Sequence, residues 1–124
     1  MIYTGNKIRV SARIPLQAVQ FIRDNNLVLN RFVNAALESF FYDADHNLIS
    51  AMTIEHLIDS RTKNTAMEET QAVQLRIERM FYDKMELEGF VRNRTIVFSV
   101  NRYILYYTRK EIAEWKLNKI RKAL

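Results

Sequence analysis

The chain has 124 residues, of which 48% are apolar, and it contains two glycines and one proline. This composition excludes a disordered tail or linker and is typical of a folded, helix-rich protein of about one domain. The lack of cysteine excludes a disulfide framework and a thiolate metal site. No apolar run approaches the roughly 18 residues of a membrane span, and the N-terminus lacks an apolar signal region. We therefore expect a soluble, cytoplasmic protein.

The net charge of +5 is distributed unevenly along the chain. Residues 1–33 carry five basic groups against one acidic group (+4), residues 34–88 five against eleven (−6), and residues 89–124 nine against two (+7). A polyanion such as nucleic acid would be contacted at the two basic ends. Ordinary solvated basic faces are the alternative explanation.

Residues 7–15 read Lys-Ile-Arg-Val-Ser-Ala-Arg-Ile-Pro and predict a β-strand, because apolar and polar side chains alternate. One side of this strand is apolar, and the other carries the donors Lys7, Arg9, Ser11 and Arg13. Pro15 ends the strand and suits the first turn of a helix. Since a lone strand leaves its backbone groups unpaired, we expect it to pair with a second chain. An edge strand kept soluble by its charges is the alternative.

Two helices are predicted after the strand. Leu16, Val19 and Ile22 form one apolar stripe over residues 16–25, and Asn25-Asn26 is a good stop signal. A second helix is expected over residues 30–42, with Asn30 as its N-cap. Its apolar face is too wide to leave in water and therefore needs a partner surface.

The rest of the chain predicts more helix and one hairpin. We expect a helix over residues 53–60, a polar loop over 61–66 and a long helix over 67–88 that ends at Gly89. Residues 90–100 predict a hairpin that turns at Asn93-Arg94, and residues 103–124 predict a closing helix. No internal repeat is evident. The expected fold is mainly α with a little β, divided into a module of residues 1–44 and a helical region of residues 45–124.

The segment from Lys7 to Phe41 resembles the ribbon–helix–helix family of small dimeric repressors of the Arc, MetJ and CopG type. The resemblance rests on Arg9-Val10-Ser11-Ala12-Arg13-Ile14-Pro15 and on the second helix, which begins Asn30-Arg31-Phe32-Val33. It implies an intertwined homodimer whose two strands form an antiparallel ribbon in the major groove of double-stranded DNA. It further implies that Arg9, Ser11 and Arg13 contact bases and that Asn30 and Arg31 hold a phosphate. Asn26 stands where a glycine is common in this family.

Residues 30–124 also look like a winged helix-turn-helix. That resemblance implies a recognition helix over 67–88, a wing with Arg92 and Arg94 at its tip, and a dimerisation helix over 103–124. The proposed recognition helix carries three basic against six acidic residues, so phosphate would repel it. Only its first turns, through Lys63, Asn64, Gln71 and Gln74, could then approach DNA.

The closing helix mixes basic and aromatic residues, including Arg109, Lys110 and Tyr106. This composition fits a nucleic-acid contact, a solvated basic face or a protein partner. Asp43, Asp45, His46 and His56 lack the spacing of a metal site, so we expect no metal, no cofactor and no enzymatic activity.

From the sequence we predict a dimeric, sequence-specific protein that binds double-stranded DNA. Its role would be transcriptional regulation, or marking a plasmid or viral site. The alternative outside this class is a structural or assembly protein without DNA contact.

Overall fold

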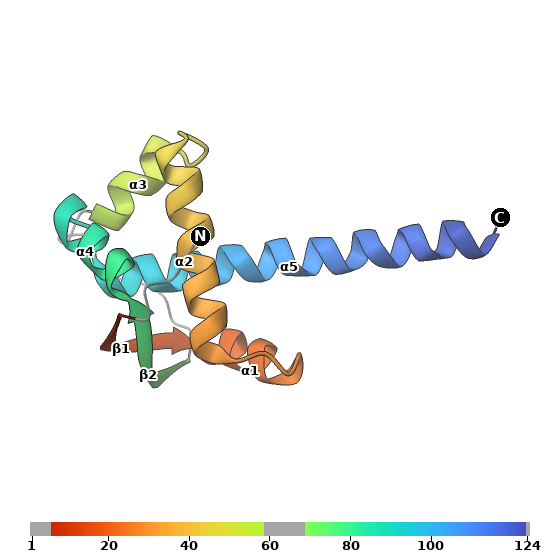
Figure 1. Ribbon diagram of the computed structural model, residues 1–124, viewed down its shortest axis with the longest axis horizontal. Helices are drawn as coiled ribbons and strands as arrows, with labels where there is room; N and C mark the ends of the chain where they lie inside the picture. Colours follow the sequence, from red (N-terminus) through yellow and green to blue (C-terminus); the bar gives the residue numbers. More distant parts are fainter. Residues whose placement is uncertain (1–5, 59–68, 124) are drawn as a thin grey trace.

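The computed structural model describes residues 6–58 and 69–123, and within these ranges the chain is mainly helical, as predicted, with one two-stranded antiparallel sheet. Figure 1 shows the sheet, formed by β1 and β2, with helices α1, α2, α4 and α5 around it and with α3 beyond one end of α2. The elements in chain order are β1 (Lys7–Pro15), α1 (Leu16–Asp24), α2 (Leu29–Asp45), α3 (Ala51–Ile58), β2 (Thr70–Glu78), α4 (Arg79–Glu88) and α5 (Arg92–Ala123). Among the described residues, no helix is both long and apolar enough to cross a membrane.

The first strand and the three helices after it confirm the sequence prediction. β1 occupies the predicted nine residues, and α1 follows directly after Pro15. Asn26 adopts a left-handed φ of 57° between α1 and α2, as expected of a stop signal built from asparagine. α2 begins one residue earlier and ends three residues later than predicted. Its N-cap is Val28, and Asn30 lies within the first turn instead of capping it. α3 begins at Ala51, two residues before the predicted start, and covers the predicted helix up to Ile58; residues 59–60 lie outside the described residues.

The long helix predicted over residues 67–88 is wrong. Thr70–Glu78 is the strand β2, only Arg79–Glu88 is helical, and residues 67–68 lie outside the described residues. The prediction used Val73 and Ile77, whose spacing of four satisfies the period of a helix and that of a strand alike. Leu75 distinguishes the strand from the helix. It is fully buried, and it lies on the same face as Val73 and Ile77 only in a strand.

The hairpin predicted over residues 90–100 is also wrong. α5 begins at Arg92 and continues to Ala123, and Gly89, at a φ of 76°, ends α4 as predicted. Ile96 and Val100 are fully buried and lie four residues apart, which is the spacing of one helical face. The β-branched residues in this segment favour a strand, but burial of that face against the core outweighs the preference. The winged arrangement therefore lacks its wing.

The chain contains two strand–helix–helix units, so the expectation that it has no internal repeat is wrong. The first consists of β1, α1 and α2, and the second of β2, α4 and α5. Corresponding elements of the two units begin 63 positions apart. The pairs of first residues are Lys7 and Thr70, Leu16 and Arg79, and Leu29 and Arg92. The same offset joins Asn26 to Gly89, the two left-handed residues between the helices of each unit. α3 lies between the units and has no counterpart.

The two units are intertwined through their strands. β1 pairs with β2 in a register that places Ser11 opposite Gln74. An approximate two-fold axis that relates the two units passes between these residues. α2 packs on the strand of the second unit, and α5 packs on the strand of the first. The strand that was expected to need a second chain is therefore paired within its own chain. The boundary expected near residue 44 does not divide the core, since β1 and β2 lie on either side of it and share one sheet.

The hydrophobic core lies beneath the inner face of this ribbon. Its apolar strand residues pack with the buried faces of α1, α2, α4 and α5, and the fully buried members include Ile14, Leu37, Phe40, Leu75 and Ile77. In α3, Leu57 is buried in this core and Ile54 packs against it. Beyond its contacts with the core, α5 extends as a single helix away from the rest of the molecule (Figure 1).

Asn34 fixes α2 to the second strand, and we expect its loss to destabilise the fold. The side chain is 5% exposed; its Nδ2 donates to the Arg76 carbonyl at 3.0 Å, and its Oδ1 accepts from the Glu78 N–H at 2.9 Å. In Asn34→Ala the buried Glu78 N–H loses its partner, which costs about 1–3 kcal/mol of unfolding free energy. Urea denaturation measures this, with Asn101→Ala, an exposed asparagine of α5, as the control. Equal midpoints for the two variants would contradict the role given to Asn34.

Candidate nucleic-acid interface

The outer face of the ribbon is basic and polar. Its exposed side chains come from alternate positions of the two strands, and they are Lys7, Arg9, Ser11, Arg13, Thr70, Ala72, Gln74 and Arg76. None of these residues, all within the described strands, is acidic. A two-stranded ribbon of this kind fits the width of the major groove, and its cations carry the sign that phosphate attracts.

The cross-strand register decides which outward side chains are neighbours. Arg9 lies opposite Arg76, and Arg13 lies opposite Ala72. Gln74 Nε2 donates to Ser11 Oγ at 2.8 Å across the centre of the ribbon. Arg13 Nε donates to Thr70 Oγ1 at 3.1 Å, which orients this guanidinium across the ribbon.

Two asparagines at corresponding positions anchor the backbone of the ribbon to the helices beneath it. Asn30 Oδ1 accepts from the Arg76 N–H at 3.0 Å, and Asn93 Oδ1 accepts from the Arg13 N–H at 2.8 Å. Asn93 Nδ2 also donates to the Arg13 carbonyl at 3.3 Å. Each asparagine is the second residue of its helix and binds the backbone of the strand that belongs to the other unit. Because both arginine backbones are fixed, their side chains project from a preorganised position.

The structure therefore separates the two residues that were predicted to hold a phosphate. The Asn30 side chain is directed to the backbone of β2, where its Oδ1 accepts from the Arg76 N–H. Arg31 is exposed in the first turn of α2. The N-cap Val28 supplies no side-chain hydrogen bond to the first turn of α2.

Arg92 and Arg94 do not lie on the tip of a wing. Both belong to the first turn of α5, where Arg92 lies over the ring of Tyr82 at 4.9 Å and donates to Glu86 at 3.2 Å. Arg94 Nη1 donates to the His56 carbonyl of α3 at 3.4 Å. Within the protein, Arg92 thus contacts an acidic side chain and Arg94 contacts a backbone carbonyl.

The first half of the basic and aromatic segment of α5 is partly used in packing. Tyr103 makes an edge-to-face contact with Phe32 at 5.1 Å, and Tyr107 makes one with Phe21 at 5.9 Å. Arg102 pairs with Asp43, and its Nη1 donates to Ser39 at 3.1 Å. Further along the helix Arg109, Lys110, Lys119 and Arg121 are exposed.

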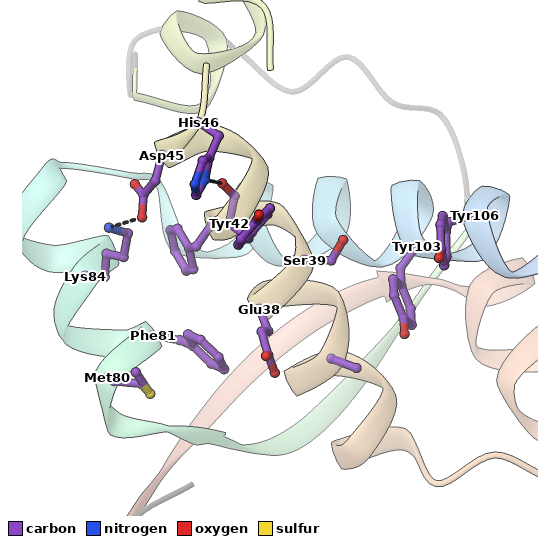
Figure 2. Close-up of a pocket in the computed structure, with 12 residues that line it drawn as sticks. Glu38, Ser39, Tyr42, Asp45, His46, Met80, Phe81, Lys84, Tyr103 and Tyr106 are labelled. Carbon is purple, nitrogen blue, oxygen red and sulfur yellow. Dashed lines mark hydrogen bonds and ion pairs between the residues drawn. The ribbon is translucent and has the colours of Figure 1, made fainter. Parts of the chain in front are cut away.

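A groove of about 630 Å³ lies between α2, α4 and the middle of α5 (Figure 2). Aromatic side chains dominate it, among them Tyr42, Phe81 and Tyr106. Two of its polar side chains have partners within the protein: Lys84 Nζ lies 3.1 Å from Asp45 Oδ2, and His46 Nδ1 lies 2.7 Å from the Tyr42 carbonyl oxygen. Burial lowers the pKa of Lys84, but its hydrogen bond to Asp45 and the nearby Glu88 raise that pKa overall. Within the described residues no cluster of three His, Cys, Asp or Glu could hold a metal ion.

Sequence reasoning found the β1 half of the interface and missed the β2 half. Ala72 and Arg76 were assigned to a helix, Gln74 was considered only on that helix, and Lys63 and Asn64 lie outside the described residues. The signal that could have found this half is the correspondence of Val10-Ser11-Ala12-Arg13-Ile14 with Val73-Gln74-Leu75-Arg76-Ile77 at an offset of 63. Comparisons of the chain with family models, with curated proteins and with solved structures gave no match.

Proposed function

We propose that this protein binds double-stranded DNA in a sequence-specific manner, with the β1–β2 ribbon in the major groove. The observation that carries the proposal is the outer face of the ribbon, on which Lys7, Arg9, Arg13 and Arg76 stand with no carboxylate among them. The strand–helix–helix order of each unit is consistent with the resemblance to the ribbon–helix–helix family. Transcriptional regulation, or marking a plasmid or viral site in the cytoplasm, would use such a protein.

The chemistry of these side chains suits the base edges of the major groove. An arginine can donate two hydrogen bonds to guanine O6 and N7, and a glutamine can bind adenine N6 and N7. Each good bidentate pair discriminates against the wrong base by about 1–3 kcal/mol. The ribbon offers Arg9, Arg13 and Arg76 for guanine and Gln74 for adenine, all exposed and on one surface.

The direct test is a selection from random duplex DNA, followed by affinity measurements on the enriched sequence. Wild type should enrich a short sequence, and Arg9→Ala/Arg13→Ala should lose the preference for it. Arg109→Ala/Arg121→Ala removes the same charge from the exposed part of α5 and should keep the preference. If wild type enriches nothing, a structural or assembly role without DNA contact becomes the better explanation.

Arg31 is expected to contact phosphate without reading sequence. Because it is exposed in the first turn of α2, Arg31→Ala should weaken binding to all duplexes by a similar factor. The slope of log affinity against log salt concentration should fall by about 1. Fluorescence anisotropy at several salt concentrations measures both quantities. An unchanged slope would exclude a phosphate contact at this position.

A further inference from the structure

The ribbon has a symmetric backbone and an asymmetric outer face. Asn30 and Asn93 anchor the two strands in the same way, and the register is centred on the pair Ser11 and Gln74. Two copies of one chain would place identical side chains on both halves of such a ribbon. Here the halves come from different sequences, so Arg9 corresponds to Ala72 and Ser11 to Gln74, while Arg13 and Arg76 correspond and are identical.

The unequal positions give the ribbon two different ends. At one end Arg9 and Arg76 face each other on the same rung, and Lys7 stands next along the outer face. At the other end Arg13 faces Ala72, and its Nε donates to Thr70 at 3.1 Å. Like charges directly opposite each other on a sheet destabilise the fold. The Arg9–Arg76 rung therefore has a cost to folding that an acceptor-rich ligand would offset.

We propose that a single copy of this chain recognises a non-palindromic duplex, richer in guanine beneath the Arg9–Arg76 end than beneath the Arg13–Ala72 end. This inference rests on the proposed function. Two guanidiniums at the first end can each take a guanine, whereas the second end offers one guanidinium and the methyl group of Ala72. Alanine makes an apolar contact with the methyl group of thymine. The two halves of the site are thus expected to differ in base composition.

Two variants make the Arg9–Arg76 and Arg13–Ala72 rungs equivalent from opposite directions. Lys7 and Thr70 stay different in both variants. Ala72→Arg/Gln74→Ser gives positions 72, 74 and 76 the same residues as Arg9, Ser11 and Arg13. Arg9→Ala instead gives position 9 the residue of Ala72 and leaves Arg13 and Arg76 matched. All the changed side chains are exposed, so the core beneath them is unaffected. Circular dichroism melting verifies the fold of both variants.

The experiment is the random-duplex selection carried out with wild type and with both variants. Wild type should enrich one asymmetric sequence, bound with a stoichiometry of one chain per duplex. Both variants should enrich sequences that are two-fold symmetric at the bases beneath these two rungs. These bases should be guanine-rich in both halves for Ala72→Arg/Gln74→Ser and guanine-poorer in both for Arg9→Ala. A palindromic wild-type site would overturn the inference and leave the proposed function standing. Variant sites as asymmetric as that of wild type would overturn it also, because the ribbon positions would then not set the halves. A failure of all three proteins to enrich any sequence would contradict the proposed function itself.

Discussion

Arg9→Ala/Arg76→Ala should reduce affinity for the enriched duplex by roughly 30-fold to 10⁴-fold while leaving the fold intact. The two side chains face each other on the exposed side of the ribbon. The loss corresponds to two bidentate contacts of about 1–3 kcal/mol each. Because the substitution also removes two like charges from one rung, the unfolding free energy should stay the same or rise by a few tenths of a kcal/mol.

A loss of DNA affinity without a loss of unfolding free energy distinguishes a binding role of these arginines from a structural one. Titration by fluorescence anisotropy gives the affinity, and urea denaturation gives the stability. Arg109→Ala/Arg121→Ala serves as the control of equal charge, and it should weaken specific and non-specific binding by similar, smaller factors. A comparable loss of specific affinity in this control would show that net charge, and not the ribbon, sets the affinity.

Phe40→Ala should lower the unfolding free energy by about 3–5 kcal/mol, the largest effect on stability that we expect of any single substitution. Phe40 is fully buried, and its ring lies 5.2–5.8 Å from those of Phe41, Phe90 and Phe98. Truncation therefore removes buried contacts in both α2 and α5 and leaves a cavity between the two units. A loss of this size is a large fraction of the stability of a typical domain.

Urea denaturation of Phe40→Ala beside Tyr42→Ala tests this expectation. Tyr42 lies on the same helix and is 61% exposed, so its truncation should change the unfolding free energy by no more than about 0.5 kcal/mol. The two variants thus compare a buried and an exposed aromatic side chain at neighbouring positions. Similar losses in both would contradict the placement of Phe40 at the centre of a shared core.

The sequence predicted the first unit well because its signals are local. Strict alternation through Lys7–Pro15, a proline at the end of the strand and Asn25-Asn26 after the helix all act within a few residues. The outward residues of β1 followed from the alternation alone, and the structure places all of them on the exposed face.

The second unit could not be predicted in the same way because its signals conflict. Val73, Ile77 and Phe81 fit the spacing of one long helix, and the β-branched run from Thr95 to Val97 fits a strand. In the fold the assignments are exchanged: the first of these segments begins as β2 and the second belongs to α5. Tertiary contacts decide the secondary structure of both segments. β1 needs a partner strand, and α5 needs Ile96 and Val100 on the face that meets the core.

The missed second unit also explains the main error in the candidate site. Without β2, the ribbon could be completed only by a second chain, so the expected outer face repeated Arg9, Ser11 and Arg13. With β2 in place, the partners are Arg76, Gln74 and Ala72. The side chains opposite β1 therefore differ from those expected, while the predicted residues of β1 lie on the outer face as expected.

Mapping the surface that contacts DNA by NMR tests the central claim most directly. ¹⁵N-labelled protein is titrated with the enriched duplex, and amide shifts are followed for each residue. We expect the largest changes at Arg9–Arg13 and Ala72–Arg76, with smaller ones in the first turn of α2 around Arg31. Changes concentrated in α5 or around the groove beside Tyr42, with an unperturbed ribbon, would contradict DNA reading by the ribbon.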